Sequence, residues 1–188
     1  MDCGNCDNKK CYEGKDCFGI AEETKIRYTG IDLDIARTAS IVERDHYMLS
    51  CRIEEIMSFA REMEYRKIGI AFCIGLEDEA LMLERILKRE FNVVSVCCKV
   101  GGVDKKEIGL VSRKDDFDAT CNPIMQAELL NRSETDLNII VGLCVGHDML
   151  FTKHSKAPVT TLIVKDRLLG HNPVSALYTS YWRRRLGL

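Results

Sequence analysis

Four near-continuous runs of apolar residues stand out along the chain, at residues 68–74, 93–98, 137–144 and 159–164. Segments with apolar residues at helical spacing separate them, at 77–90, at 123–131 and, more briefly, at 148–152. Parallel strands show such unbroken apolar runs because helices cover both faces of their sheet. The pattern predicts an α/β fold, a three-layer sandwich around a roughly four-stranded, mostly parallel sheet of order 2-1-3-4.

The pattern differs before the first of these strands. Residues 32–65 have helical spacing, and Asp32 and Ser50 are the expected N-caps of two helices. Residues 1–19 are polar and rich in cysteine and glycine, so this segment cannot fold by burying an apolar face. We therefore divide the chain into a cysteine-rich segment, 1–19, and an α/β domain, 20–188, whose one long irregular stretch is 101–120.

Composition narrows the class of protein. The 188 residues carry a net charge of −2, and no run approaches the roughly 18 apolar residues of a membrane span. The near-neutral charge argues against specific binding of nucleic acid or of a membrane surface. The first residues lack the features of a signal peptide, so we expect a cytoplasmic protein. There, ten cysteines are typical of metal ligands or reactive thiols rather than disulfides.

Four of the cysteines lie close together at the start of the chain. Cys3, Cys6, Cys11 and Cys17 form the spacing C-x2-C-x4-C-x5-C, which offers four soft thiolate donors to one ion. A ferredoxin would place its third cysteine after only two further residues. The spacing predicts a metal, with zinc favoured and an iron–sulfur cluster as the alternative. Four protein ligands leave no open position, so we expect a structural role.

Other cysteines fall where the predicted strands end, at the edge where open α/β sheets bind ligands. In the flavodoxin- or Rossmann-like order 2-1-3-4, Cys73 and Cys144 flank the point where the crossovers diverge, and Cys98 ends the strand beside them. Cys121 opens a helix, whose dipole would lower its pKa. Free cysteines also commonly fill space, so packing is the alternative for each of these and the expectation for Cys51.

Residues 142–149 read as a strand end, a glycine turn and the start of a helix. The backbone amides around Gly146 could stabilise negative charge, and His147 could act as a base or second ligand for Cys144. Asp148 could orient His147; the alternative is that Asp148 caps the helix and His147 is an ordinary turn residue.

Charged and polar residues follow the last strand and reach the same predicted edge. Lys165, Asp166 and Arg167 come directly after the strand, and His171 and Asn172 lie in the loop beyond it. We expect these five residues to bind or orient a small polar substrate; the alternative for the first three is a solvated turn held by ion pairs.

These blocks together resemble an uncharacterised family of cysteine-rich bacterial and archaeal proteins, a domain of unknown function labelled as metal-binding. The segments that carry the resemblance are the four N-terminal cysteines and residues 69–73, 98–101, 121–123, 142–148, 165–167 and 171–173. The resemblance covers nearly the whole chain. It implies a metal at the N-terminal cysteines and implies no particular reaction.

Three hypotheses about function remain open from the sequence. In the first, Cys144 is a nucleophile assisted by His147 in thiol-dependent or sulfur-handling chemistry, beside a separate zinc site. In the second, Cys98, Cys121 and Cys144 hold an iron–sulfur cluster or a second metal with an open coordination position. In the third, the protein is a non-enzymatic metal carrier or sensor. The expected partners are a small polar molecule or a metal ion, and the sequence leaves the oligomeric state open.

Overall fold

The computed structural model describes residues 1–188 and divides them into two compact units, 1–49 and 50–188. The cysteine-rich segment 1–19 lies in the first unit, together with two further helices, and the second unit contains all four strands. The proposed division of roles at residue 19 stays a prediction. No helix in either unit has the length and apolar character needed to cross a membrane.

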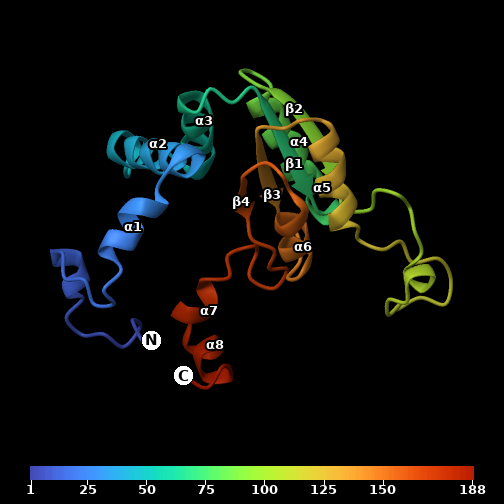
Figure 1. The fold of residues 1–188 in the computed structure, drawn as a ribbon. Helices are drawn as coiled ribbons and strands as arrows, with labels where there is room; N and C mark the ends of the chain where they lie inside the picture. Colours follow the sequence, from blue (N-terminus) through green and yellow to red (C-terminus); the bar gives the residue numbers. More distant parts are fainter. The chain divides into compact units, whose positions relative to one another are not determined.

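The first unit consists of helices with few buried side chains. Its elements are η1 Lys10–Glu13, α1 Ala21–Arg27 and α2 Gly30–His46 (Figure 1). The Asp16 carboxylate accepts the backbone N–H groups of Phe18, Ile20 and Ala21, which fixes the start of α1. Among residues 1–30 only Cys6 is partly shielded from solvent. Burial of apolar surface therefore contributes little to the order of this segment.

The second unit is built on a four-stranded sheet in which every neighbouring pair is parallel. The strands are β1 Lys67–Phe72, β2 Asn92–Cys97, β3 Leu137–Val141 and β4 Val159–Ile163, in the order β2-β1-β3-β4. Phe72 of β1 pairs with Cys97 on one side and with Val141 on the other, so the strands end level with one another. The predicted parallel sheet of order 2-1-3-4 is confirmed.

Helices cover both faces of this sheet (Figure 1). The helices are α3 Arg52–Glu62, α4 Glu77–Leu87, α5 Pro123–Arg132 and α6 His147–His154. Ile68 and Ile70 of β1 pack in one core cluster with side chains of α3 and α4, whereas Ala71 packs in a second cluster with those of α5 and α6. This alternation of side chains between the two faces gives the predicted three-layer sandwich.

A glycine allows the layers to approach closely at the sheet centre. A β-carbon on Gly69 would stand 2.0 Å from Oδ1 of Asn138 and 2.9 Å from a methyl carbon of Leu130. Asn138 is fully buried, and both ends of its amide are satisfied because it accepts from the Thr135 hydroxyl at 2.8 Å and donates to the Ser155 hydroxyl at 2.8 Å. Only glycine fits at position 69.

The starts of the two helices that precede β1 differ from the predictions. Helix α2 follows Thr29 rather than starting at Asp32, and the N-cap of α3 is Cys51 rather than Ser50, because Cys51 has extended backbone and its N–H donates to the Glu54 carboxylate at 2.8 Å. Cys51 is exposed, so the expectation that it packs in the core is wrong.

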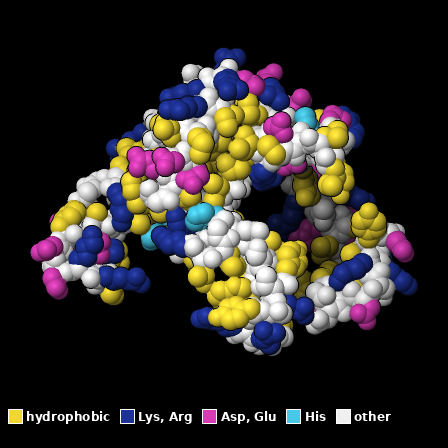
Figure 2. Space-filling model, turned by 180° about the vertical axis from the view of Figure 1, so that it is seen from behind, with side chains coloured by type: hydrophobic (Ala, Val, Ile, Leu, Met, Phe, Trp, Pro, Cys, Tyr) yellow, Lys and Arg dark blue, Asp and Glu magenta, His cyan; other side chains and the backbone are white.

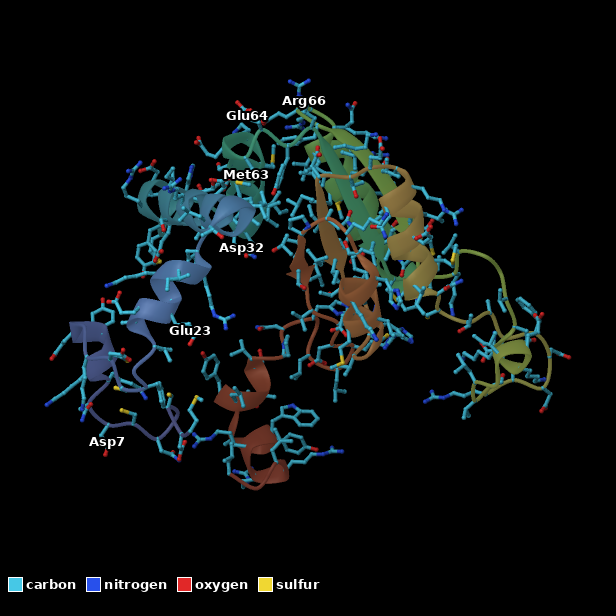
Figure 3. All side chains as sticks on the ribbon, viewed as in Figure 1. Asp7, Glu23, Asp32, Met63, Glu64 and Arg66 are labelled. Carbon is cyan, nitrogen blue, oxygen red and sulfur yellow. The ribbon has the colours of Figure 1, made fainter.

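The connection from α3 to β1 is short and pinned by a carboxylate. Figure 3 labels Met63, Glu64 and Arg66 along it, and Glu64 turns the chain through a positive φ of 57°. The N–H groups of Arg66 and Lys67 both donate to one oxygen of Asp136, at 2.8 Å each. This ties the amino end of β1 to the turn that precedes β3.

Short elements complete the second unit. They are η2 Ile74–Leu76, η3 Lys105–Ile108, α7 Ser175–Tyr178 and α8 Ser180–Arg185. The stretch 101–120, expected to be irregular, contains η3 and an antiparallel bridge between Asp104 and Ala119. A 2.7 Å ion pair between Lys105 and Asp118 holds the same segment.

Candidate functional site

Four cysteines lie at the carboxyl end of the sheet. Cys73 follows β1 directly and is buried, and Cys98 follows β2 and is 2% exposed. Cys144 lies in the turn after β3, and Cys121 immediately precedes the N-cap of α5; both are partly exposed. Thiols from four segments of the chain therefore lie at one edge of the sheet.

Two of these thiols are in contact, since the sulfur atoms of Cys98 and Cys121 lie 3.8 Å apart. Backbone bonds fix this distance: the Asn122 N–H donates to the Cys98 carbonyl at 2.7 Å, and the Cys98 N–H donates to the Phe72 carbonyl at 2.8 Å. Asn122 also caps α5, since its side-chain oxygen accepts the Met125 N–H at 3.2 Å. The start of α5 is thus joined directly to the end of β2.

The two thiols differ strongly in acidity. The 3.8 Å contact with the Cys98 sulfur, with the charges of Lys99 and His147, lowers the pKa of Cys121 to about 5 against the opposing effect of burial. The contact with Cys121 and burial raise the pKa of Cys98 far above its ordinary value. Negative charge is therefore favoured on the partly exposed Cys121 rather than on the buried Cys98.

Cys144 has a different partner. The guanidinium of Arg167 donates to the Cys144 sulfur at 3.7 Å. This bond raises the pKa of Arg167, and Cys73 and Cys121 contribute in the same direction. One arginine therefore lies within electrostatic reach of three of the four thiols, which is a favourable setting for negative charge on sulfur.

The turn from Cys144 into α6 uses its own backbone amides. The N–H groups of His147 and Asp148 donate to the Cys144 carbonyl at 2.9 and 3.1 Å. The Asp148 carboxylate accepts the N–H groups of Gly146 and Met149 at 2.9 and 2.8 Å. Asp148 thus holds the helix start, the Gly146 amide is not available to a ligand, and the charge of His147 favours the thiolate of Cys121.

The predicted site residues after β4 differ in what their side chains contact. Lys165 lies over the strand ends: β-carbons on Gly75 and Gly142 would come within 3.5 Å of its Nζ and Cδ atoms. Asp166 closes its own turn instead, because its carboxylate accepts two backbone N–H groups and its N–H donates to Nδ1 of His171 at 3.1 Å. Asn172 is exposed and makes backbone hydrogen bonds only. In Figure 2, histidine side chains lie beside lysine or arginine side chains on the face shown.

The N-terminal cysteines lie in the first unit. Cys3, Cys11 and Cys17 are exposed and Cys6 is partly exposed. Their sulfurs make only weak local contacts, such as those of Cys11 with the Lys9 carbonyl and Cys17 with the Lys15 carbonyl, each at 3.8 Å. The structure contains no group of three or more His, Cys, Asp or Glu side chains arranged to hold a metal. Metal binding at these cysteines stays a prediction.

Three residues near the thiols were not among the predicted site residues. Cys73 belongs to the cluster by position, and its place at a strand end was the available signal. Lys99 follows Cys98 in the sequence, and its ammonium donates to the Ala119 carbonyl at 2.6 Å. Gln126 is fully buried beside them, and its amide donates to carbonyls of β1 and β2 at 3.1 and 2.7 Å. A glutamine on the buried face of a helix was the signal for the last.

Comparison with known proteins identifies relatives of the whole chain. The model of a family described as "Protein of unknown function (DUF1847)" matches residues 12–162, which include Cys17 and the four strand-end cysteines. An uncharacterised protein of the archaeon Methanocaldococcus jannaschii is 53% identical over 192 residues, covering 99% of this chain and 98% of that protein. No solved structure matches. The chain therefore belongs to the family of unknown function DUF1847, which confirms the resemblance to an uncharacterised family.

Proposed function

We propose that this protein carries out thiol–disulfide chemistry at the carboxyl edge of its sheet, with Cys121 as the nucleophile and Cys98 as the second thiol. The observation that carries the proposal is the 3.8 Å contact between a buried and a partly exposed cysteine sulfur on two joined segments. A reactive thiolate needs a positive, partly accessible environment, which Lys99 and His147 supply for Cys121.

The chemistry proceeds by two exchanges. The Cys121 thiolate forms a bond to one sulfur of a disulfide substrate, the substrate S–S bond breaks, and its other sulfur leaves as a thiolate. Cys98 then loses its proton to solvent and attacks the Cys121 sulfur, which releases the second half of the substrate as a thiolate. The substrate gains two electrons and the protein holds a Cys98–Cys121 disulfide. A low-molecular-weight dithiol returns the pair to its reduced form, as a cytoplasmic setting requires.

The sequence hypothesis gave the nucleophilic role to Cys144. The contact between Cys144 and Arg167 fits a thiolate as well, so Cys144 is retained in the proposed site as a neighbouring thiol. The Cys144 sulfur is hydrogen-bonded to Arg167 rather than to another cysteine, whereas the Cys121 sulfur lies 3.8 Å from that of Cys98. This difference favours Cys121 as the residue attacked in the second exchange.

The experiment is to map reactive thiols and disulfides by mass spectrometry. Brief treatment with a limiting alkylating reagent at pH 6 should label Cys121 first, and mild oxidation with diamide should yield a Cys98–Cys121 disulfide. Cys121→Ser should abolish both results. Cys51→Ser is the matched control, because Cys51 is an exposed thiol outside the site and serine can also serve as the N-cap of α3. Preferential labelling of another cysteine, or oxidation without the Cys98–Cys121 bond, would refute the proposal.

We also propose that Cys3, Cys6, Cys11 and Cys17 bind one zinc ion with a structural role. The donor chemistry supports this, since the four thiols are accessible and have no strong partners. Residues 1–30 bury almost no side chain, so burial supplies little free energy to order them. Zinc binding can supply that free energy instead.

Elemental analysis of anaerobically purified protein tests the metal. About one zinc per chain is expected, lost in Cys11→Ser and retained in Cys51→Ser, with faster proteolysis of residues 1–19 in the first variant. Equal zinc in both variants would contradict the assignment. Broad visible absorption that bleaches on reduction would instead support an iron–sulfur cluster.

A further inference from the structure

Two cations at the thiol edge lack carboxylate partners. Arg167 contacts the Cys144 sulfur, and the Lys165 side chain crosses the ends of β1 and β3, over Gly75 and Gly142. Neither forms an ion pair; the nine ion pairs of the chain involve other residues. The positive charge of both side chains is therefore not neutralised by a carboxylate within the protein.

The nearby carboxylates are occupied elsewhere. Asp148 accepts the N–H groups of Gly146 and Met149, which fixes the start of α6. Asp166 accepts the N–H groups of two residues in its own turn. Neither carboxylate bonds to the side chain of Lys165 or Arg167. Lys99, whose ammonium is bound to a carbonyl, and His147 add to the positive character around Cys121.

We propose that the disulfide substrate of this site is a small compound bearing an anionic group, such as a carboxylate, which Arg167 and Lys165 bind next to Cys121. The inference rests on the proposed thiol–disulfide function and names its substrate class. An arginine guanidinium offers a fork of N–H donors suited to an oxyanion, and a lysine ammonium adds a point charge. In the exchange step these two residues hold the anionic half of the substrate, while the Cys121 thiolate bonds to the nearer sulfur and the other sulfur leaves.

The site also favours this class by its effect on the leaving group. A thiolate leaves as the S–S bond breaks, and positive charge from Arg167 lies within electrostatic reach of Cys73, Cys121 and Cys144. The same cations therefore attract the substrate before the exchange and stabilise the sulfur anion formed by it. Neutral disulfides would gain only the second effect.

The test compares two alkylating reagents of similar size and the same leaving group: iodoacetate, which is anionic, and iodoacetamide, which is neutral. The measured quantity is the ratio of their rate constants at Cys121, because a change in the thiolate fraction cancels in this ratio. Relative to the neutral thiol 2-mercaptoethanol, the ratio should be raised by about tenfold at low salt, as a charge a few ångströms away in a partly screened site implies.

Variants distinguish a failure of the anionic-substrate inference from a failure of the proposed thiol–disulfide function. Arg167→Gln and Lys165→Gln should each lower the ratio by about threefold or more, whereas Lys153→Gln, an equal charge change at an exposed position on α6, should leave it unchanged. A ratio equal to that of 2-mercaptoethanol, or one insensitive to both site variants, would overturn the anionic-substrate inference while leaving the thiol function standing. If Cys121 reacts with neither reagent, the proposed function itself fails.

Discussion

The acidity of Cys121 gives a distinctive dependence of its reactivity on pH. A pKa of about 5 makes Cys121 about 90% thiolate at pH 6, where an ordinary cysteine of pKa near 8.5 is only about 0.3% thiolate. A less basic thiolate is also a weaker nucleophile, and over this interval the loss is about 40-fold. Cys121 should therefore react about sevenfold faster than an ordinary thiol at pH 6 and about tenfold slower at pH 8.

The assay is the rate of iodoacetamide labelling of Cys121 between pH 4 and pH 9, followed by mass spectrometry of the peptide that contains it. The rate should be nearly constant above pH 7 and should fall as the pH is lowered through about 5, since protonation removes the thiolate. The groups that face this sulfur are Cys98, Lys99, His147 and Arg167.

Substitution of Cys98 tests the cause. Cys98→Ala removes the hydrogen-bond partner of Cys121, and the loss of a hydrogen bond to a charged group, about 1.5–3 kcal/mol, corresponds to a rise of about one to two pH units in the labelling midpoint. Cys98→Ser keeps a hydrogen-bonding group at the same position and should move the midpoint less. A midpoint near 8 in the unaltered protein, or equal midpoints in the two variants, would refute this account of the thiol pair.

Three further predictions concern stability. Gly142→Ala should lower the free energy of unfolding by about 3 kcal/mol in urea titrations, because φ is +65° and the new β-carbon would stand 2.0 Å from a methyl carbon of buried Leu76; an unchanged midpoint would contradict this contact. Gln126→Leu should lower the free energy of unfolding by about 1–3 kcal/mol, since it removes the side-chain donor to the Phe72 and Val96 carbonyls, of which the Phe72 carbonyl keeps the Cys98 N–H. The Lys105 ammonium, 2.7 Å from the Asp118 carboxylate, is the largest of the effects that hold the pKa of Asp118 at about 2. The ionised carboxylate therefore contributes stability that is fully present above its ordinary pKa near 4 and is lost as the pH falls through 2. Asp118→Asn should remove this contribution at neutral pH and speed proteolysis within 101–120.

The pattern of apolar residues was sufficient to predict the sheet, because a parallel strand covered on both faces is a nearly unbroken apolar run. Strands β1 and β3 consist mostly of apolar residues. It was also sufficient to place Cys98 and Cys144 at one edge, since the carboxyl ends of parallel strands coincide. Short exposed helices such as α1 and α8 have no buried face, so their apolar residues show no pattern that marks them.

The finer arrangement of the site depended on contacts that spacing does not encode. The contact of Cys98 with Cys121 depends on one backbone hydrogen bond across a long segment, and the direction of the Arg167 side chain depends on the turn that Asp166 closes. The oxyanion role expected for the Gly146 amide did not account for Asp148, whose carboxylate accepts that same N–H. Side chains that satisfy local backbone groups compete with ligands for the same atoms.

The joint between Cys98 and Cys121 has a consequence for how such a site can vary among relatives. The cysteines are 23 positions apart, yet the 2.7 Å bond from Asn122 to the Cys98 carbonyl closes the intervening segment at its base. Doubling the length of a flexible loop costs only about 0.6 kcal/mol in closure entropy, so insertions or deletions within 101–120 can occur without moving either sulfur. Relatives can therefore differ in the number of residues between these two cysteines while the sulfurs stay in contact, and a search for a fixed cysteine spacing would overlook equivalent sites.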